Sequence, residues 1–188
     1  MEAGAEREEV GWVVALRRAQ RRSRRHAIAR YAQLATVEAG APRCRTVVVR
    51  GVDAERGAVW FVTDGRSAKA AQLVADPRAE ICWYFAGLRE QYRLRGAIEP
   101  LEPAARQEAW EGLSPASRAV FFAPPPGTPR GEGDRFAETS EAPEPPACFR
   151  ALRLVVARAE LLELRPSPHE RRAWVREGEG WVSTRLRP

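Results

Sequence analysis

The residues best suited to hold an anion lie in the stretch FVTDGRSAK, residues 61–69. The chain contains 31 lysine and arginine residues, and Lys69 is the only lysine among them. A strand-like run ends at Thr63 and a helical pattern begins near Ser67, which places unpaired backbone N–H groups and the positive end of a helix dipole beside both side chains. Arg45 begins a strand that we expect to pair with residues 58–63. Together these groups predict a pocket for a dianion such as a phosphate monoester.

A second interpretation of Lys69 stays open, because most lysines on short helices are simply exposed to solvent. One property favours Lys69 as a phosphate ligand. A lysine ammonium is a compact charge on a flexible stem, whereas an arginine presents a planar fork. A tight phosphate site could therefore accept one side chain and reject the other.

Other chemical motifs are sparse. The two histidines, His26 and His169, stand in no hydrolase or metalloprotease pattern, and Cys44, Cys82 and Cys148 are too widely spaced for a metal or disulfide framework. We interpret the cysteines as buried free thiols and predict no metal site. A protein with few acid–base residues and a phosphate pocket can rely on a bound cofactor for its reaction.

Composition limits the possible partners. The 188 residues fit one domain, 1–188, and the net charge of +6 comes from scattered arginines that are densest in residues 17–30. Nucleic-acid binding through that cluster is the weakest hypothesis, since no aromatic residues alternate with the charges. No signal peptide and no apolar run of about 18 residues is visible, so we expect a cytoplasmic protein that does not enter a membrane.

The hydrophobic periodicity predicts a mainly β fold. A helix is expected at residues 8–22, within an N-terminal helical region 1–27. A second is expected at 67–77, with Ala70, Leu73 and Val74 on its buried face, and one or two more at 103–122. Strands are expected at 31–37, 45–52, 58–63, 79–87, 90–101 and 149–164, followed by a hairpin at 171–188 that turns at Gly178 to Gly180. Short polar turns favour antiparallel pairing, and a small closed barrel would remove the exposed edges.

Four blocks in this order resemble one known family. RTVVVRG (45–51), FVTDGRSAK (61–69), ICWYF…LREQYRLRG (81–96) and PHERRAW…WVSTRLRP (168–188) are similar to the pyridoxamine 5′-phosphate oxidase family of FMN-binding split barrels. The resemblance implies a six-stranded antiparallel split β-barrel of Greek-key type with peripheral α-helices. It also implies a homodimer with FMN between the subunits. The activity implied is that of an FMN-dependent oxidoreductase, in which a small-molecule substrate passes a hydride to flavin N5 and oxygen or another acceptor reoxidises the flavin.

The resemblance also implies roles for individual residues. Arg45 and Lys69 correspond to the residues that hold the FMN phosphate, with Ser67 beside them. The backbones of Val47 and Val48 would lie along the isoalloxazine ring, and Thr63 closes the second strand that contacts the flavin. Gln91 corresponds to a glutamine that hydrogen-bonds the flavin, and Arg171 to an arginine supplied by the partner chain.

Several positions depart from the family pattern. Ala68 stands where a second basic residue is common, and Arg66 is expected to compensate. Leu161 or Leu162 replaces a tryptophan near the flavin. Ser114 replaces the arginine that binds the substrate phosphate, with Arg118 about one helical turn away. The expected substrate contacts are Arg50, which takes the place of a lysine, together with His169 and Arg118.

These departures leave alternatives open. A non-catalytic flavin-binding or carrier protein of the same fold is the second hypothesis, and the sequence does not distinguish FMN from a deazaflavin. The proline- and glycine-rich loop 123–147 is long enough to suggest a lid over the site.

Overall fold

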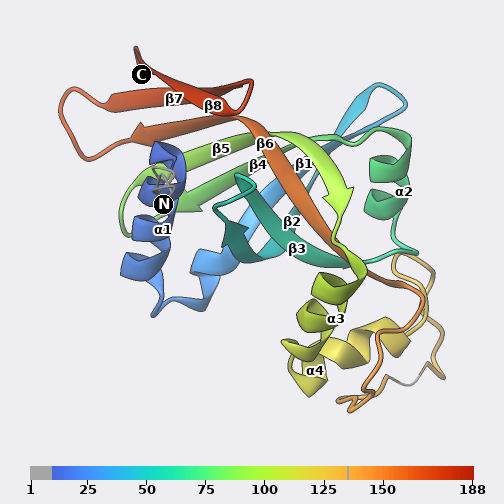
Figure 1. Cartoon of the computed structure of the whole chain (residues 1–188). Coiled ribbons are helices and arrows are strands. Elements are labelled where there is room, and N and C mark those ends of the chain that lie inside the picture. The colour runs from blue at the N-terminus through green and yellow to red at the C-terminus, as the bar shows by residue number, and fades with distance from the viewer. Residues whose placement is uncertain (1–9, 135) are drawn as a thin grey trace, which may run out of the picture.

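Six antiparallel strands form a closed barrel in the computed structural model, which describes residues 10–134 and 136–188 (Figure 1). The strands are β1 (Tyr31–Glu38), β2 (Ala41–Asp53), β3 (Ala58–Asp64), β4 (Arg78–Phe85), β5 (Glu90–Pro100) and β6 (Phe149–Glu163). They lie in the order β3-β2-β1-β4-β5-β6, and a further pairing of β3 with β6 closes the barrel. Because β1 to β3 form a meander and β4 returns beside β1, the arrangement is the predicted Greek key.

A C-terminal hairpin extends the same sheet beyond the barrel. It consists of β7 (Glu170–Glu177) and β8 (Gly180–Leu186), and β7 pairs with β6. The turn contains Gly178 with φ of 58°, a conformation that glycine adopts without strain. The predicted position of this hairpin is confirmed.

Helices lie around the barrel. They are α1 (Gly11–Ser23), α2 (Ala68–Ala75), α3 (Pro103–Glu111) and α4 (Pro115–Ala119), with 3₁₀ turns at Ala27–Arg30 and Val120–Phe122. In Figure 1, α1 and α2 lie on opposite sides of the barrel, while α3 and α4 lie below it beside the long loop. The predicted region 103–122 is two helices, and the Ser114 hydroxyl caps the second by accepting the backbone N–H of Ser117 at 3.3 Å. Residues before 10 in the predicted N-terminal helix lie outside the described residues. Within the described residues, no helix is long and apolar enough to cross a membrane.

The second strand begins earlier than predicted. The sequence predicted this strand at 45–52, but β2 already starts at Ala41. Ala39 and Gly40 alone form the turn, with φ of 49° and 80°, values typical of a two-residue hairpin loop. Pro42 is tolerated in the strand because its missing N–H falls on an edge that has no strand partner at this point.

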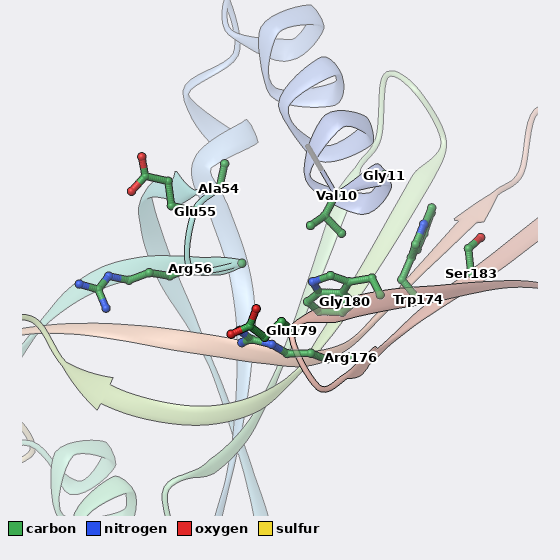
Figure 2. A pocket seen from close by; sticks show the side chains of 12 residues that line it. Val10, Gly11, Ala54, Glu55, Arg56, Trp174, Arg176, Glu179, Gly180 and Ser183 are labelled. Atoms are coloured by element: carbon green, nitrogen blue, oxygen red, sulfur yellow. The ribbon is translucent and has the colours of Figure 1, made fainter. Parts of the chain in front are cut away.

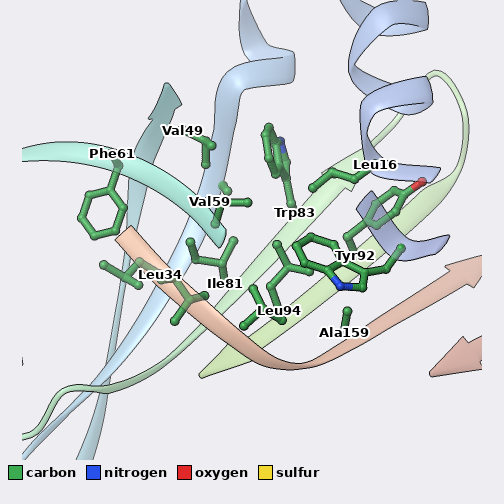
Figure 3. Close-up of a cluster of buried hydrophobic side chains, with 14 of the residues drawn as sticks. Leu16, Leu34, Val49, Val59, Phe61, Ile81, Trp83, Tyr92, Leu94 and Ala159 are labelled. Carbon is green, nitrogen blue, oxygen red and sulfur yellow. The ribbon is translucent and has the colours of Figure 1, made fainter. Parts of the chain in front are cut away.

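The interior of the barrel is one apolar cluster (Figure 3). Leu34, Ile81 and Leu94 face each other across β1, β4 and β5 and have no exposed surface. From α1, Leu16 adds to this cluster, so the helix packs against the barrel. Trp110 and Phe149 belong to a second, smaller cluster that joins α3 to the sheet.

Candidate functional site

The barrel is split between β2 and β3 at one end. Residues 41–48 of β2 pair with β1, whereas pairing of β2 with β3 begins only at Val49 opposite Phe61. β3 pairs with β6 along its whole length, so its residues from Val62 to Asp64 have a strand partner on that side only. Among the described residues, no strand covers this edge of residues 41–48. The peptide groups of Val47 and Val48 therefore border an open edge of the sheet. The side chain of Val47 is buried and that of Val48 is half-buried.

Arg45 lies at this split, within residues 41–48 of β2, which do not pair with β3. Its Nη1 donates to the Thr36 hydroxyl at 2.6 Å and to the Leu34 carbonyl at 3.3 Å, and its Nη2 donates to Gln72 Oε1 at 2.6 Å. Burial lowers the pKa of the guanidinium, although it still ionises at any ordinary pH. Arg45 forms no ion pair within the described residues.

Lys69 lies in the first turn of α2, close to Arg45. Its ammonium donates to the Ser67 hydroxyl at 3.3 Å, and that hydroxyl donates to the Asp64 carbonyl at 2.6 Å. Burial, followed by the positive charge of Arg45, lowers the pKa of Lys69. Two cations thus lie near one another. The charges of Asp64 and Glu38 act on Lys69 and Arg45 respectively, but within the described residues neither cation forms an ion pair, and this arrangement favours a bound anion.

Thr63 adds an unsatisfied polar group at the same end. Its side chain is 4 % exposed, and its hydroxyl has no hydrogen-bond partner in the described structure. A buried hydroxyl without a partner is costly, so it marks a place where a ligand atom or a water molecule would be stabilised.

Arg66 has a different set of contacts from those predicted. Its guanidinium makes a two-pronged ion pair with Asp64, with Nη2 at 2.6 Å from Oδ2, and it also donates to the carbonyls of Phe121 and Ala123. It therefore ties the start of loop 123–147 to the turn before α2. Its role in compensating for Ala68 stays a prediction.

Gln91 and Arg171 lie in one row across neighbouring strands. Gln91 is opposite Leu162, and Leu162 is opposite Arg171, so the two polar residues are about 10 Å apart with the leucine between them. Arg171 Nη2 lies 2.5 Å from Glu160. Burial raises the pKa of Glu160, but the hydrogen bonds from Arg171 and Arg158 outweigh it, and the net pKa is lowered. This row lies on the outer face of the sheet, since Leu161 on the same strand is buried in the core.

The three expected substrate contacts are not gathered in one place by the single chain. Arg50 is the extra residue of a bulge, because Val49 pairs with Phe61 while Gly51 pairs with Trp60, and its Nε is buried without a partner in the described structure. His169 is exposed in the connection before β7. Arg118 donates to the carbonyls of Trp110 and Glu111, which gives it contacts inside the second cluster.

Two residues near Arg45 were missed by the sequence reasoning. Thr36 and Gln72 are 2 % and 6 % exposed and accept the guanidinium of Arg45. Val74 was expected on the buried face of α2 and is 88 % exposed instead. The helix turns Gln72 inward because its amide finds hydrogen-bond partners there. In the sequence, the only indication that Gln72 is buried was its position between Ala71 and Leu73.

The three cysteines form no disulfide in the described structure, and Cys44 is exposed. The expectation that all three are buried was therefore wrong: Cys82 and Cys148 are only partly buried, and Cys44 lies opposite Ala35 on the outer face of the β1–β2 hairpin.

A cavity of the described structure lies elsewhere. It has a volume of about 980 Å³ and lies between the start of α1, the β2–β3 turn and the C-terminal hairpin, beside Trp174, Trp181 and Arg176 (Figure 2). None of the predicted cofactor or substrate residues lines it. Its size alone does not indicate that it is the reactive site.

Comparisons with known proteins agree with one another. Residues 9–101 match the model of the family described as pyridoxamine 5′-phosphate oxidase, FMN-binding domain. Pyridoxine/pyridoxamine 5′-phosphate oxidase 2 of Arabidopsis thaliana is 31 % identical over 84 % of this chain and 87 % of its own length. The pyridoxine/pyridoxamine 5′-phosphate oxidase of Anaeromyxobacter dehalogenans is 34 % identical over 84 % of each chain.

A solved structure is similar over nearly the whole chain. It is a pyridoxamine 5′-phosphate oxidase-related, FMN-binding protein of Nostoc punctiforme, 36 % identical, with a TM-score of 0.88 over 96 % of this chain and 100 % of that one. PhzG of Burkholderia lata, at 21 % identity and a TM-score of 0.79 over 97 % of this chain and 95 % of its own, shares the fold.

Proposed function

Because the chain belongs to the pyridoxamine 5′-phosphate oxidase family of FMN-binding proteins, we propose that it is an FMN-dependent oxidoreductase whose FMN phosphate is held by Arg45, Ser67 and Lys69. The observation that carries this proposal is the pair of cations at the split of the barrel without a carboxylate partner in the described structure. The unpartnered Thr63 hydroxyl also fits a polar ligand there.

Each residue has a physical role in this proposal. Arg45 and Lys69 supply charge-assisted hydrogen bonds to the phosphate, each contributing ~1.5–3 kcal/mol. The open edge at Val47 and Val48 offers peptide groups to the planar ring, and Gln91 donates or accepts at its polar rim. When bound, FMN supplies the chemistry, accepting a hydride from a reduced small-molecule substrate and passing the electrons to oxygen or another acceptor.

The site is proposed to lie between two copies of the chain. Arg45 is on β2 and Arg171 is on β7, with β1, β4, β5 and β6 between them one way around the barrel and β3 and β6 the other way, through the pairing of β3 with β6. Arg171 is held by Glu160 on the outer face of the sheet, and we propose that the Arg171 beside the FMN bound at Arg45 comes from a second copy. Tyr31 and Tyr84, exposed by 44 % and 43 % on the outer face of β1 and β4, are suited to contact a second copy.

The proposal also assigns residues that contact the substrate. Arg50 and His169 are retained as contacts for an anionic or hydroxylated substrate, with pyridoxamine or pyridoxine 5′-phosphate as the first compounds to test. Arg118 is given a structural role, because its guanidinium is directed to backbone carbonyls.

A second function, a non-catalytic flavin carrier, is favoured by one observation. Leu162 lies between Gln91 and Arg171 on the outer face, which supports the proposal that it is the leucine in the place of the expected tryptophan. Anaerobic titration of the FMN-loaded protein with the two vitamin B6 phosphates separates the hypotheses. Bleaching of the flavin absorbance supports the oxidoreductase, and unchanged absorbance with FMN firmly retained supports the carrier.

The phosphate assignment has its own test. Lys69→Ala should weaken FMN binding by roughly 10- to 100-fold, the loss of one charge-assisted hydrogen bond. Arg78→Ala is the matched control, because Arg78 follows the same helix but is largely exposed and paired with Asp76. Fluorescence titration of the apoprotein measures both affinities, and equal affinity of the Lys69 variant and the unmodified protein would reject the assignment.

A further inference from the structure

Two buried neutral side chains determine where the Arg45 guanidinium lies. Thr36 comes from β1 and Gln72 from α2, and both are more than nine-tenths buried. Arg45 donates to Thr36 Oγ1 and to Gln72 Oε1 at 2.6 Å each, and the Thr36 hydroxyl donates to the same Gln72 oxygen at 2.7 Å. The three side chains thus form a closed triangle of hydrogen bonds.

The orientation of the Gln72 amide is fixed from its other end. Gln72 Nε2 donates to Glu38 Oε1 at 3.1 Å, while the second oxygen of Glu38 accepts from Arg43 at 2.7 Å. Hydrogen bonds from Arg43 and Gln72 lower the pKa of Glu38, which keeps the carboxylate ionised and able to accept. Because the amide nitrogen points to Glu38, the amide oxygen must point to Arg45 and Thr36.

The acceptors that hold Arg45 are uncharged, and this affects how much of its positive charge is available to a ligand. Three arginines of this chain are held by carboxylates, namely Arg66 by Asp64, Arg153 by Glu102 and Arg171 by Glu160. Arg45 is held instead by a hydroxyl and by amide and peptide oxygens, which restrict its geometry without forming an ion pair. Gln72 bridges Arg45 and Glu38, and the Glu38 charge acts on Arg45 without a direct contact.

The contacts leave part of the guanidinium available. All of the Arg45 hydrogen bonds described involve Nη1 and Nη2, and its Nε has no acceptor in the described structure. An Arg guanidinium can bind a phosphate through Nε and a neighbouring Nη, two donors in one plane.

We propose that Thr36 and Gln72 are positioning residues that aim Arg45 at the FMN phosphate while holding it through neutral acceptors and not through an ion pair. This inference rests on the proposed function, since it assumes that Arg45 binds the phosphate. It assigns to two buried residues a selectivity for the phosphorylated flavin over the unphosphorylated one.

The test compares FMN with riboflavin, which has the same ring but no phosphate. Gln72→Leu and Thr36→Val should each lower the affinity for FMN by roughly 10-fold, as expected for loss of one hydrogen bond to a charged group. Affinity for riboflavin should not change, and its retention shows that the variant is folded. Thr36→Ser keeps the hydroxyl and should keep the ratio of FMN to riboflavin affinity.

Gln72→Glu separates positioning from charge. The carboxylate can still hold Arg45, but it cancels the positive charge, so the FMN to riboflavin ratio should fall although the residue is nearly isosteric. In an Arg45→Ala background, Gln72→Leu should produce no further change in the ratio. An equal fall in that background, or an unchanged ratio in Gln72→Leu alone, overturns the positioning role.

Failure of the underlying function gives a different result. If Arg45→Ala itself leaves the ratio of FMN to riboflavin affinity unchanged, then the phosphate is bound elsewhere. The proposed phosphate site and the positioning role are then both rejected. If Arg45→Ala lowers the ratio but Gln72→Leu and Thr36→Val do not, only the positioning role is rejected.

Discussion

A single lysine in an arginine-rich chain has a physical explanation at this site. Lys69 lies half-buried beside Arg45, where burial and the neighbouring cation lower its pKa. The compact ammonium donates to the Ser67 hydroxyl, and we propose that it also contacts the phosphate, whereas a guanidinium needs room for its planar fork. The cost of holding two like charges together is offset when a dianion binds between them.

This electrostatic coupling predicts a pH dependence of FMN affinity. The FMN phosphate is already a dianion above about pH 7. Of the proposed phosphate contacts, Lys69 is therefore the one whose charge changes between about pH 7 and the ordinary lysine pKa of about 10.4. The apoprotein releases the Lys69 proton at a lowered pKa, and FMN binding restores the proton. Affinity should therefore be full below the lowered pKa and fall as the pH rises through it.

The matched control for this pH dependence is Lys69→Arg, whose guanidinium does not titrate in this range. The alkaline fall in FMN affinity should disappear in that variant, whatever its absolute affinity. Riboflavin measured at the same pH values corrects for any titration of the ring. An equal alkaline fall in the Lys69→Arg variant would show that another group is responsible.

At the scale of the elements, the barrel depends on a close approach between β5 and β6. A Cβ atom added to Gly96 would lie 1.9 Å from the backbone oxygen of Val155, at a bulge where the pairing of the two strands shifts register. Backbone atoms in a paired strand cannot move aside cheaply. Gly96→Ala should therefore destabilise the fold by about 1–3 kcal/mol or more, as overpacking does.

Gly87→Ala serves as the comparison, because a Cβ atom there meets no atom within 4 Å. Urea unfolding of both variants measures the difference in free energy. Equal midpoints for the two variants would mean that the bulge can absorb the added methyl group.

Local sequence patterns predicted most helices and strands. The burial of individual side chains depended on packing between segments that are distant in the chain. The strands, the short helix after β3 and the C-terminal hairpin follow from periodicity and turn residues that lie within a few positions of each other. Arg45, Ser67 and Lys69 were expected near one another, and the described structure places Lys69 beside both Ser67 and Arg45.

What the sequence could not predict depends on partners distant in the chain. Gln72 is buried and Val74 exposed because Thr36 and Arg45, on other strands, supply hydrogen bonds that outweigh side-chain hydropathy. That Leu162, and not Leu161, lies in one row with Gln91 and Arg171 became evident only from the register of β5, β6 and β7. Neither pattern is visible in a window of neighbouring residues.

At the scale of the whole molecule, the two groups of proposed flavin contacts lie on different faces of one chain. Arg45 points to the barrel end beneath α2, where it meets buried Thr36 and Gln72. Arg171 lies on the outer face beyond β6, where it meets Glu160. We propose that the two arginines reach one FMN from different copies of the chain.

That arrangement predicts complementation between two inactive variants. Arg45→Ala and Arg171→Ala should each bind FMN weakly as a homodimer, because every site then lacks one cation. In a mixed dimer, one site lacks both arginines and the other is intact. Coexpressed variants carrying different affinity tags, purified through both tags, should therefore bind close to one FMN per dimer with the affinity of the unmodified protein.

The stoichiometry separates this arrangement from a site built within one chain. In that case each copy in the mixed dimer would carry its own defect, and no site of unmodified affinity would form. Combining both substitutions in one chain and pairing it with an unmodified chain provides the reverse control. With sites shared between copies, that dimer contains one defect in each site and should lose high-affinity binding, whereas self-contained sites would leave one site intact.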